Sequence, residues 1–179
     1  QPGGSGEGDV LVHFGAALVT EPGFAMTTTI ESKLLSGAVT VSVDGGKTWY
    51  SAAPSDDAVL PLPTNAGAPA VLVHHDGVGY VVARDAALMP YPSTASLHLQ
   101  VANVTGNWSA VGTFVAPLQT NAMFTLWFQH APGDTAPDQG YAYAVLPATP
   151  LAAFQANWSA VTASKSVVRN DAAVQAAYD

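Results

Sequence analysis

Two alternating apolar runs lie close together in the chain, and they constrain the fold more than any other feature. The first is Phe124-Thr-Leu-Trp-Phe-Gln-His130, and the second is Gly140-Tyr-Ala-Tyr-Ala-Val-Leu-Pro147. A period of two is typical of strands, and the stretch between the runs is rich in proline, glycine and aspartate. Pro147 ends the second run because proline has no amide hydrogen to give to a ladder. We therefore expect an antiparallel β pair with a loose loop.

Other segments repeat the strand pattern. Val39, Val41 and Val43 alternate with polar residues before the tight-turn signal Asp44-Gly45-Gly46, and Asp76-Gly77 separates two further apolar runs. The expected strands are residues 10–20, 25–33, 38–43, 48–51, 70–75, 78–83, 96–102, 108–114 and 122–130. Such a series of short strands with frequent turns favours an all-β, antiparallel β-sandwich.

Two stretches depart from this pattern. Residues 55–69 are rich in proline, aspartate, asparagine and glycine, which predicts a long loop. Thr149 followed by Pro150 fits the start of a helix, so residues 151–158 are expected to form a short helix. Residues 171–178 are interpreted as a second, weak helix or the start of a further element. We expect residues 1–8 to be a flexible lead and residues 9–179 to be a single β-sandwich domain.

The composition excludes several classes of function. Thirteen acidic residues against five lysines and arginines give a net charge of −8. Phosphate groups need basic clusters, so neither nucleic acid nor insertion into a membrane is expected. No apolar run is long enough to span a bilayer. The chain has no cysteine, which excludes disulfides and thiolate metal sites. We expect no metal and no cofactor.

Three Asn-x-Ser/Thr sequons occur, at Asn103, Asn107 and Asn157. Together with the lack of cysteine and the low charge content, they favour a secreted, extracellular glycoprotein from a eukaryote. The first two sequons are so close that both need not carry a glycan.

The segment Ser42-Val-Asp-Gly-Gly-Lys-Thr-Trp49 matches the Asp-box pattern of sialidase propellers. Asp44 can bond turn amides, glycine supplies positive φ, and Trp49 can cover the hairpin. The box occurs once here, whereas propellers repeat it. The chain also lacks an arginine triad, since its only arginines are Arg84 and Arg169. We interpret the motif as a structural hairpin.

Candidates for acid–base or metal chemistry are weak in this sequence. His74 and His75 are adjacent on an expected strand and so point to opposite faces, which prevents them from chelating one ion easily. The carboxylates considered for acid–base work are expected in turns or on solvated surface. They are Glu21, Glu31, Asp56, Asp57, Asp134 and Asp138. No nucleophile elbow, phosphate loop or dinucleotide fingerprint is present.

Aromatic side chains offer a different function, because they can stack on sugar rings, although most aromatics of a sandwich form its core. The candidates are Trp49, Trp108, Trp127, Trp158, Tyr80, Tyr91, Tyr141 and Tyr143. Trp108 and Trp158 lie inside sequons, which favours a surface position. We predict Trp108, Trp158, Tyr141 and Tyr143 as the carbohydrate-binding residues.

Several segments together resemble polysaccharide lyase family 8, the hyaluronate, chondroitin and xanthan lyases. The resemblance covers most of residues 9–179 and depends on the shared order of motifs. They are Thr28-Thr-Ile-Glu31 with Lys33-Leu34, Asp76-Gly-Val-Gly-Tyr80, Gly106-Asn-Trp108 with Val111, the block from Phe124 to Pro147, and the segment from Ala173 to Asp179.

The resemblance implies the later part of the central super-sandwich of that family. It also implies that the catalytic asparagine, histidine, tyrosine and arginine belong to an N-terminal helical toroid, with a glutamate from an earlier β region. No segment of this chain matches those motifs, so no catalytic residue is carried over to it.

Three functions follow as hypotheses. The first is a secreted, non-catalytic, lectin-like protein that binds a glycan or a cell-surface glycoprotein. The second is a fragment or subunit of a lyase that cleaves uronic-acid polysaccharides by β-elimination, whose partner is the missing part of the lyase precursor. The third is a structural or oligomerising module, since the edge strands of a sheet can pair with a second copy.

Overall fold

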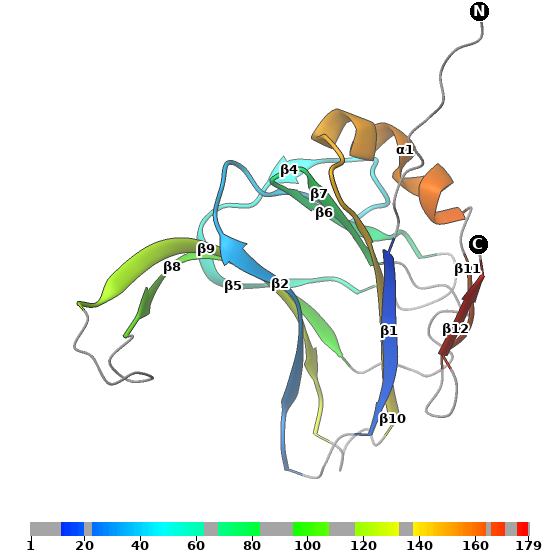
Figure 1. The fold of residues 1–179 in the computed structure, drawn as a ribbon, viewed down its shortest axis with the longest axis horizontal. Helices are drawn as coiled ribbons and strands as arrows, with labels where there is room; N and C mark the ends of the chain where they lie inside the picture. The colour runs from blue at the N-terminus through cyan, green and yellow to red at the C-terminus, as the bar shows by residue number, and fades with distance from the viewer. Residues whose placement is uncertain are drawn as a thin grey trace, which may run out of the picture.

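A computed structural model describes residues 12–19, 23–62, 68–82, 95–107, 117–132, 138–163, 166–170 and 175–178. These residues form two antiparallel sheets that share a core, one helix and a small hairpin (Figure 1). The expected all-β antiparallel sandwich is thereby confirmed. The strand expected at 108–114 and the lead at 1–8 lie outside the described residues.

The first sheet has six strands in the order β1-β10-β7-β6-β3-β4. They are β1 (Val12–Val19), β3 (Thr40–Ser42), β4 (Tyr50–Ser51), β6 (Val71–His75), β7 (Val78–Val82) and β10 (Asp138–Leu146). β6 and β7 form the hairpin predicted at Asp76-Gly77. Both turn residues have positive φ, 50° at Asp76 and 74° at Gly77, as the tightest hairpin turns require.

The second sheet has four strands in the order β2-β9-β8-β5. They are β2 (Met26–Leu34), β5 (Ser55–Leu60), β8 (Ser96–Gly106) and β9 (Gln119–His130). The prediction that residues 124–130 pair with residues 140–147 is therefore wrong. β9 pairs with β2 and β8, whereas β10 pairs with β1 and β7 in the other sheet.

The main core lies between the sheets. Phe124, Leu126 and Phe128 of β9 are fully buried there, and they meet Val73 and Tyr80 of the six-stranded sheet. Burying each large apolar side chain contributes about 1.5–3 kcal/mol. The alternation that marked residues 124–130 in the sequence is thus the inner face of β9.

A helix, α1 (Leu151–Ala163), covers the outer face of the six-stranded sheet (Figure 1). It confirms the helix expected at 151–158 and extends it. Phe154 is fully buried against Leu72, Val81 and Leu146. Gly79 allows the close approach, since a Cβ at this position would lie 2.4 Å from the Phe154 ring. Because the sheet is covered on both sides, every residue of β6 is buried.

Two further expectations are wrong. Residues 55–60 were expected in a loop but form the edge strand β5, which pairs with β8. Its prolines, Pro54 and Pro61, flank the strand and do not interrupt its ladder. Residues 175–178, interpreted as part of a weak helix or as the start of a further element, form the strand β12 (Gln175–Tyr178) and pair with β11 (Ser166–Asn170), which rules out the helix. So short a segment cannot sustain a helix alone, whereas pairing supplies its backbone with partners.

β8 and β9 continue together beyond the sandwich as a two-stranded ribbon. The pairing of β2 with β9 ends at Leu34 and Met123, but β8 and β9 remain paired as far as Gly106 and Gln119. All described residues of this ribbon from Asn103 onward are exposed, on both faces. Figure 1 shows the ribbon as an arm at the left of the molecule.

The Asp-box segment is a structural hairpin between β3 and β4, as interpreted. Asp44 accepts hydrogen bonds from the Ser42 hydroxyl at 2.8 Å and from the amides of Lys47 and Thr48 at 3.1 and 2.9 Å. The Trp49 indole donates to the Gly46 carbonyl at 2.9 Å. The carboxylate thus gathers the amides of a turn whose backbone would otherwise face water.

Replacing Asp44 with asparagine is expected to lower the stability of the protein near neutral pH. In acid, the variant and the wild-type protein should be equally stable. Hydrogen bonds, that of the Thr48 amide foremost, lower the pKa of Asp44 from 3.8 to about 2. A depressed pKa stabilises the fold above the ordinary value, and this stabilisation is lost as pH falls through about 2. Thermal midpoints of both proteins from neutral pH to about pH 2 will show the gap closing. An equal gap throughout contradicts the assignment.

Candidate functional site

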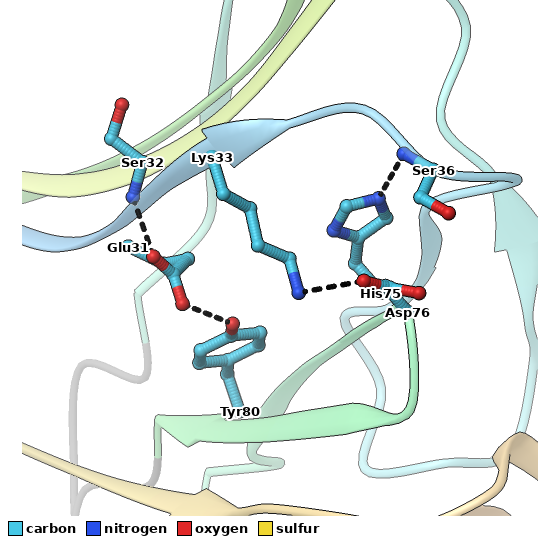
Figure 2. A network of polar contacts seen from close by, with 7 residues as sticks. All are labelled: Glu31, Ser32, Lys33, Ser36, His75, Asp76 and Tyr80. Carbon is cyan, nitrogen blue, oxygen red and sulfur yellow. Dashed lines mark hydrogen bonds and ion pairs between the residues drawn. The ribbon is translucent and has the colours of Figure 1, made fainter.

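A group of ionisable side chains gathers where β2 meets the β6–β7 hairpin (Figure 2). A β-bulge in β2 places them there, since the register with β9 shifts between Thr29 and Glu31. Ile30 and Glu31 are both partly buried as a result, and Lys33 follows on the inner side while Leu34 is 62% exposed. Strict alternation would instead have turned Glu31 and Lys33 outward.

Two polar links from β2 reach the other sheet. The Tyr80 hydroxyl of β7 donates to Glu31 at 3.0 Å, and Lys33 forms an ion pair with Asp76 at 3.2 Å. The second carboxylate oxygen of Glu31 accepts from the Ser32 amide at 2.9 Å. Glu31 had been expected in a turn or on solvated surface. Its position on a bulged strand, bonded to a buried tyrosine, corrects that expectation.

A third link comes from His75 of β6, whose Nε2 accepts from the Ser36 amide at 3.1 Å. The neutral ring must then carry its proton on Nδ1, a buried atom that has no partner among the described residues. The ring of Phe124 lies 4.6 Å away, centroid to centroid. Burial, reinforced by the charge of Lys33, lowers the pKa of His75 and keeps the ring neutral.

The other pKa shifts of this group also follow from its contacts. Burial and the negative charge of Glu31 raise the pKa of Tyr80, so its phenol stays protonated and acts as a donor. The hydrogen bond from Lys33 lowers the pKa of Asp76. Glu31 and Lys33 of β2 are thus bonded to Tyr80 and Asp76 of the β6–β7 hairpin, and His75 is bonded to Ser36 in the segment after β2. We call the set Glu31, Lys33, Ser36, His75, Asp76 and Tyr80 the inter-sheet clamp, and its geometry holds the sheets together.

The outer face of the four-stranded sheet differs from the clamp, because its side chains are exposed or partly exposed within the described part of the chain. Residues that are direct cross-strand partners share a face, so the register defines rows across the strands. One row is Thr29, Trp127, His98 and Val59, and the neighbouring rows are Ser32, Thr125 and Gln100 on one side and Thr27, Gln129 and Ser96 on the other. With strands about 4.8 Å apart, the central row spans roughly 14 Å. We call these ten residues the Trp127 face.

Four side chains of the Trp127 face are exposed, and the other six are partly exposed; the exposed ones are Thr27, Thr29, Ser32 and Val59, and Trp127 is among the partly exposed ones. The imidazole of His98 stacks on Trp127, with centroids 5.1 Å apart and an interplanar angle of 22°. His98 is itself held by Ser96, whose hydroxyl lies 2.7 Å from Nε2. The indole is thus fixed on one side and has the short side chain of Thr29 as its other cross-strand neighbour.

The structure does not bring the four predicted carbohydrate-binding residues together. Tyr141 and Tyr143 stack on each other with centroids 6.3 Å apart, and both contact the buried Phe128 of the main core. Trp158 is partly buried on α1, and a Cβ on Gly46 would come within 2.9 Å of its Nε1. Trp108 lies outside the described residues. Their contact with sugar stays a prediction.

The three sequon asparagines are all at exposed positions. Asn103 and Asn107 lie along the β8–β9 ribbon, and Asn157 lies on α1. A glycan could project into solvent from each, and whether any carries one stays a prediction.

Sequence reasoning named Trp127 only among many aromatics and missed its setting. The polar partners are visible in the sequence, since Thr125 and Gln129 alternate with the buried phenylalanines. That pattern predicts a strand with one solvated face and could have placed Trp127 on it. The bulge at Ile30, in contrast, could not have been predicted from the residue pattern of β2.

Two kinds of site receive no support from the structure. No group of three or more histidine or carboxylate side chains suited to a metal ion occurs within the described ranges. None of the helical structure in those ranges is long and apolar enough to cross a membrane.

Comparison with known families gives a match over most of the chain. Residues 8–158 match the model of the super-sandwich domain of polysaccharide lyase family 8. A search of curated proteins finds no match.

Two solved structures share the fold. A chondroitinase AC lyase, studied in complexes with oligosaccharides, superposes with a TM-score of 0.61 and 21% identity over 85% of this chain and 19% of that chain. A Paenibacillus xanthan lyase gives 0.62 and 19% identity over 93% of this chain and 15% of that chain. The chain thus spans less than a fifth of either enzyme.

Proposed function

Because the chain belongs to polysaccharide lyase family 8, within its super-sandwich domain, we propose that it is the carbohydrate-holding part of a polysaccharide lyase. The substrate class is a uronic-acid-containing polysaccharide cleaved by β-elimination. The elimination chemistry comes from residues outside this chain. Family membership favours this interpretation of the sequence over a free-standing lectin-like glycoprotein.

The observation that carries the proposal is the use of the ionisable groups in the inter-sheet clamp. β-Elimination needs a base to remove the proton beside the uronate carboxyl group, a group to neutralise that carboxylate, and a proton donor for the leaving oxygen. In the clamp, Tyr80 stays protonated and donates a hydrogen bond to Glu31, while Lys33 is paired with Asp76. His75 is buried and neutral. These groups are engaged in contacts that hold the two sheets together. We therefore propose that this chain binds the polysaccharide and does not supply the elimination chemistry.

The setting of the protein follows from the substrate class. A polysaccharide cannot cross a membrane before it is cut, so we place the protein outside the cell. The sequons at Asn103, Asn107 and Asn157 fit a secreted glycoprotein. The proposed partners are the polysaccharide and the catalytic part of the lyase. Self-association through a sheet edge is a secondary proposal, for which the edge strand β5 is a candidate.

The test is an elimination assay on the isolated chain. Hyaluronan, chondroitin and xanthan are incubated with the protein, and the ultraviolet absorbance of the unsaturated uronate product is followed. We expect no product, with wild-type protein and a Tyr80→Phe variant equally inactive. Glycan binding is measured on the same samples by an array and by affinity electrophoresis, and we expect retention of at least one polysaccharide.

Each result bears on the proposal. Product formation that disappears in the Tyr80→Phe variant would show that the clamp is catalytic and would overturn the division of roles. Lack of product with retained binding supports it. Lack of binding to every saccharide tested would remove the carbohydrate-holding role and leave a structural one.

A further inference from the structure

We propose that the Trp127 face is a saccharide-binding platform whose ligand is a run of uncharged hexopyranose units. This inference rests on the proposed carbohydrate-holding function and assigns it a site and a ligand class. The platform is distinct from the four aromatics that the sequence suggested, which lie in or beside the core, on α1 or outside the described residues.

The immediate surroundings of Trp127 suit a sugar. Its cross-strand neighbours are Thr29 and His98, and its neighbours on the same face of β9 are Thr125 and Gln129. All four are polar. Thr125, His98 and Gln129 already bond Ser32, Ser96 and the Met26 carbonyl, and hydroxyl, imidazole and amide groups can make further hydrogen bonds to sugar hydroxyls. The indole offers the apolar surface on which the C–H face of a pyranose ring packs. Ligand-binding sites combine aromatic side chains with a small number of placed polar groups in the same way.

The orientation of the indole is fixed before any ligand arrives. His98 stacks on one ring face at 5.1 Å, and its own position is held by Ser96. Ser32 and Thr125 bond through their hydroxyls at 3.3 Å in the next row. Such preorganisation lowers the entropy that binding must overcome. His98 lies against one face of the indole, and the cross-strand neighbour on the β2 side is the short side chain of Thr29.

The charge of the face selects the ligand class. None of its ten residues is lysine, arginine, aspartate or glutamate, in a chain of net charge −8. A uronate placed here would lose water from its carboxylate without gaining a cationic partner, and the chain would repel it at long range. Uncharged hexopyranose units meet neither obstacle. The uronate units of the same polysaccharide would then lie elsewhere on the lyase.

A protein layer is the other occupant that an open sheet face could accept. The cores of such interfaces are apolar and poor in polar groups. Here the polar residues surround the central tryptophan, whereas the exposed aliphatic side chains Leu34 and Val59 lie toward the edge strands. This arrangement favours a sugar over a second sheet or a second copy of the chain.

The experiment measures binding of cello- and chito-oligosaccharides, as neutral probes, and of hyaluronan oligosaccharides, as uronate probes. Calorimetry and quenching of tryptophan fluorescence are the readouts. We expect wild-type protein to bind a neutral probe with an affinity insensitive to salt. Trp127→Ala should weaken it by at least about tenfold. Tyr50→Ala, an exposed aromatic at the edge of the other sheet, is the matched control and should bind like wild type.

A second variant, Thr29→Arg, tests the same site if the Trp127→Ala protein does not fold. Thr29 is exposed, so the substitution is compatible with the strand. The guanidinium can lie over the indole by a cation–π contact and block a neutral ring. It would, in contrast, strengthen binding of a uronate. We expect weaker binding of the neutral probes by at least about tenfold.

The outcomes separate this proposal from the proposed function. Equal affinity of wild type and both variants for a neutral probe overturns the platform but leaves carbohydrate binding elsewhere on the chain intact. A preference for hyaluronan that weakens with salt and rises in Thr29→Arg overturns the ligand class. A dimer in light scattering that Trp127→Ala dissociates shows a protein occupant and overturns the proposal. Failure of wild type to bind any saccharide overturns both proposals.

Discussion

Replacing Phe154 with alanine is expected to destabilise the protein by about 3–5 kcal/mol. The side chain is fully buried between α1 and the outer face of the six-stranded sheet, and it contacts the rings of Trp49 and His74 with centroids 5.9 and 5.7 Å away. Its loss leaves a cavity in the smaller of the two cores, and the surroundings of such a cavity relax only partly. Chemical denaturation will measure the change.

Phe24→Ala is the matched control for this experiment. Phe24 is 66% exposed, so its truncation opens no cavity and should alter the free energy of unfolding by no more than about 0.5 kcal/mol. Equal losses in the two variants would mean that α1 does not seal the sheet. A loss for Phe154→Ala that is accompanied by release of the helix, seen as reduced helical circular dichroism, would strengthen the assignment.

Replacing Gly79 with alanine, which adds one methyl group, is expected to destabilise the protein by about 1–3 kcal/mol. The added Cβ would lie 2.4 Å from two carbons of the Phe154 ring, a separation that forces the helix or the ring to move. Aromatic rings cannot bend aside as flexible chains can. Gly106→Ala is the control, since a Cβ there meets nothing within 4 Å.

The two sites can be tested as a cycle. If the ring of Phe154 is what the methyl group meets, Gly79→Ala should cost much less in a protein that already carries Phe154→Ala, because the cavity accepts the methyl group. Neighbouring residues that share a contact depart from additivity by about 0.5–3 kcal/mol. Additive losses would show that Gly79 is needed for its own backbone and not for the helix.

Local patterns in the sequence predicted the elements of the fold better than their partners. The β6–β7 hairpin follows from Asp76-Gly77, since aspartate and glycine tolerate positive φ. The inner face of β9 follows from its alternation. Periodicity does not encode which strand lies beside which. The prediction that residues 124–130 pair with residues 140–147 depended only on their closeness in the sequence, and it is wrong.

A difference between β9 and β10 explains their separation. β10 carries apolar residues on both faces, since Tyr143 faces the main core while Ala144 and Leu146 face α1. β9 alternates with Thr125 and Gln129, so it can bury one face only. Strands buried on both sides belong to a covered sheet and strands buried on one side to an open one. The two runs therefore required different sheets.

The candidate sites were harder to predict than the fold. The bulge at Ile30 moves Glu31 and Lys33 from the outer to the inner side, and no residue pattern announces the shift. The setting of Trp127 depends on Thr29 and His98, which come from strands far away in the sequence. The extent of the single domain over residues 9–179 stays a prediction, as do the sugar contacts proposed for Trp108 and Trp158.

The β8–β9 ribbon should also affect how the backbone amides of the protein exchange with solvent. Among the residues that the structure describes, its outer end has hydrogen bonds between two strands, with no third strand and no buried side chain. Two-stranded pairs of this kind are only marginally stable in water. The backbone amides beyond Asn103 should therefore exchange with deuterium through local opening, at a rate unrelated to global unfolding. The amides of β6 and β7, which are covered on both sides, should exchange only when the whole protein unfolds. The ribbon can therefore change its conformation while the sandwich stays folded.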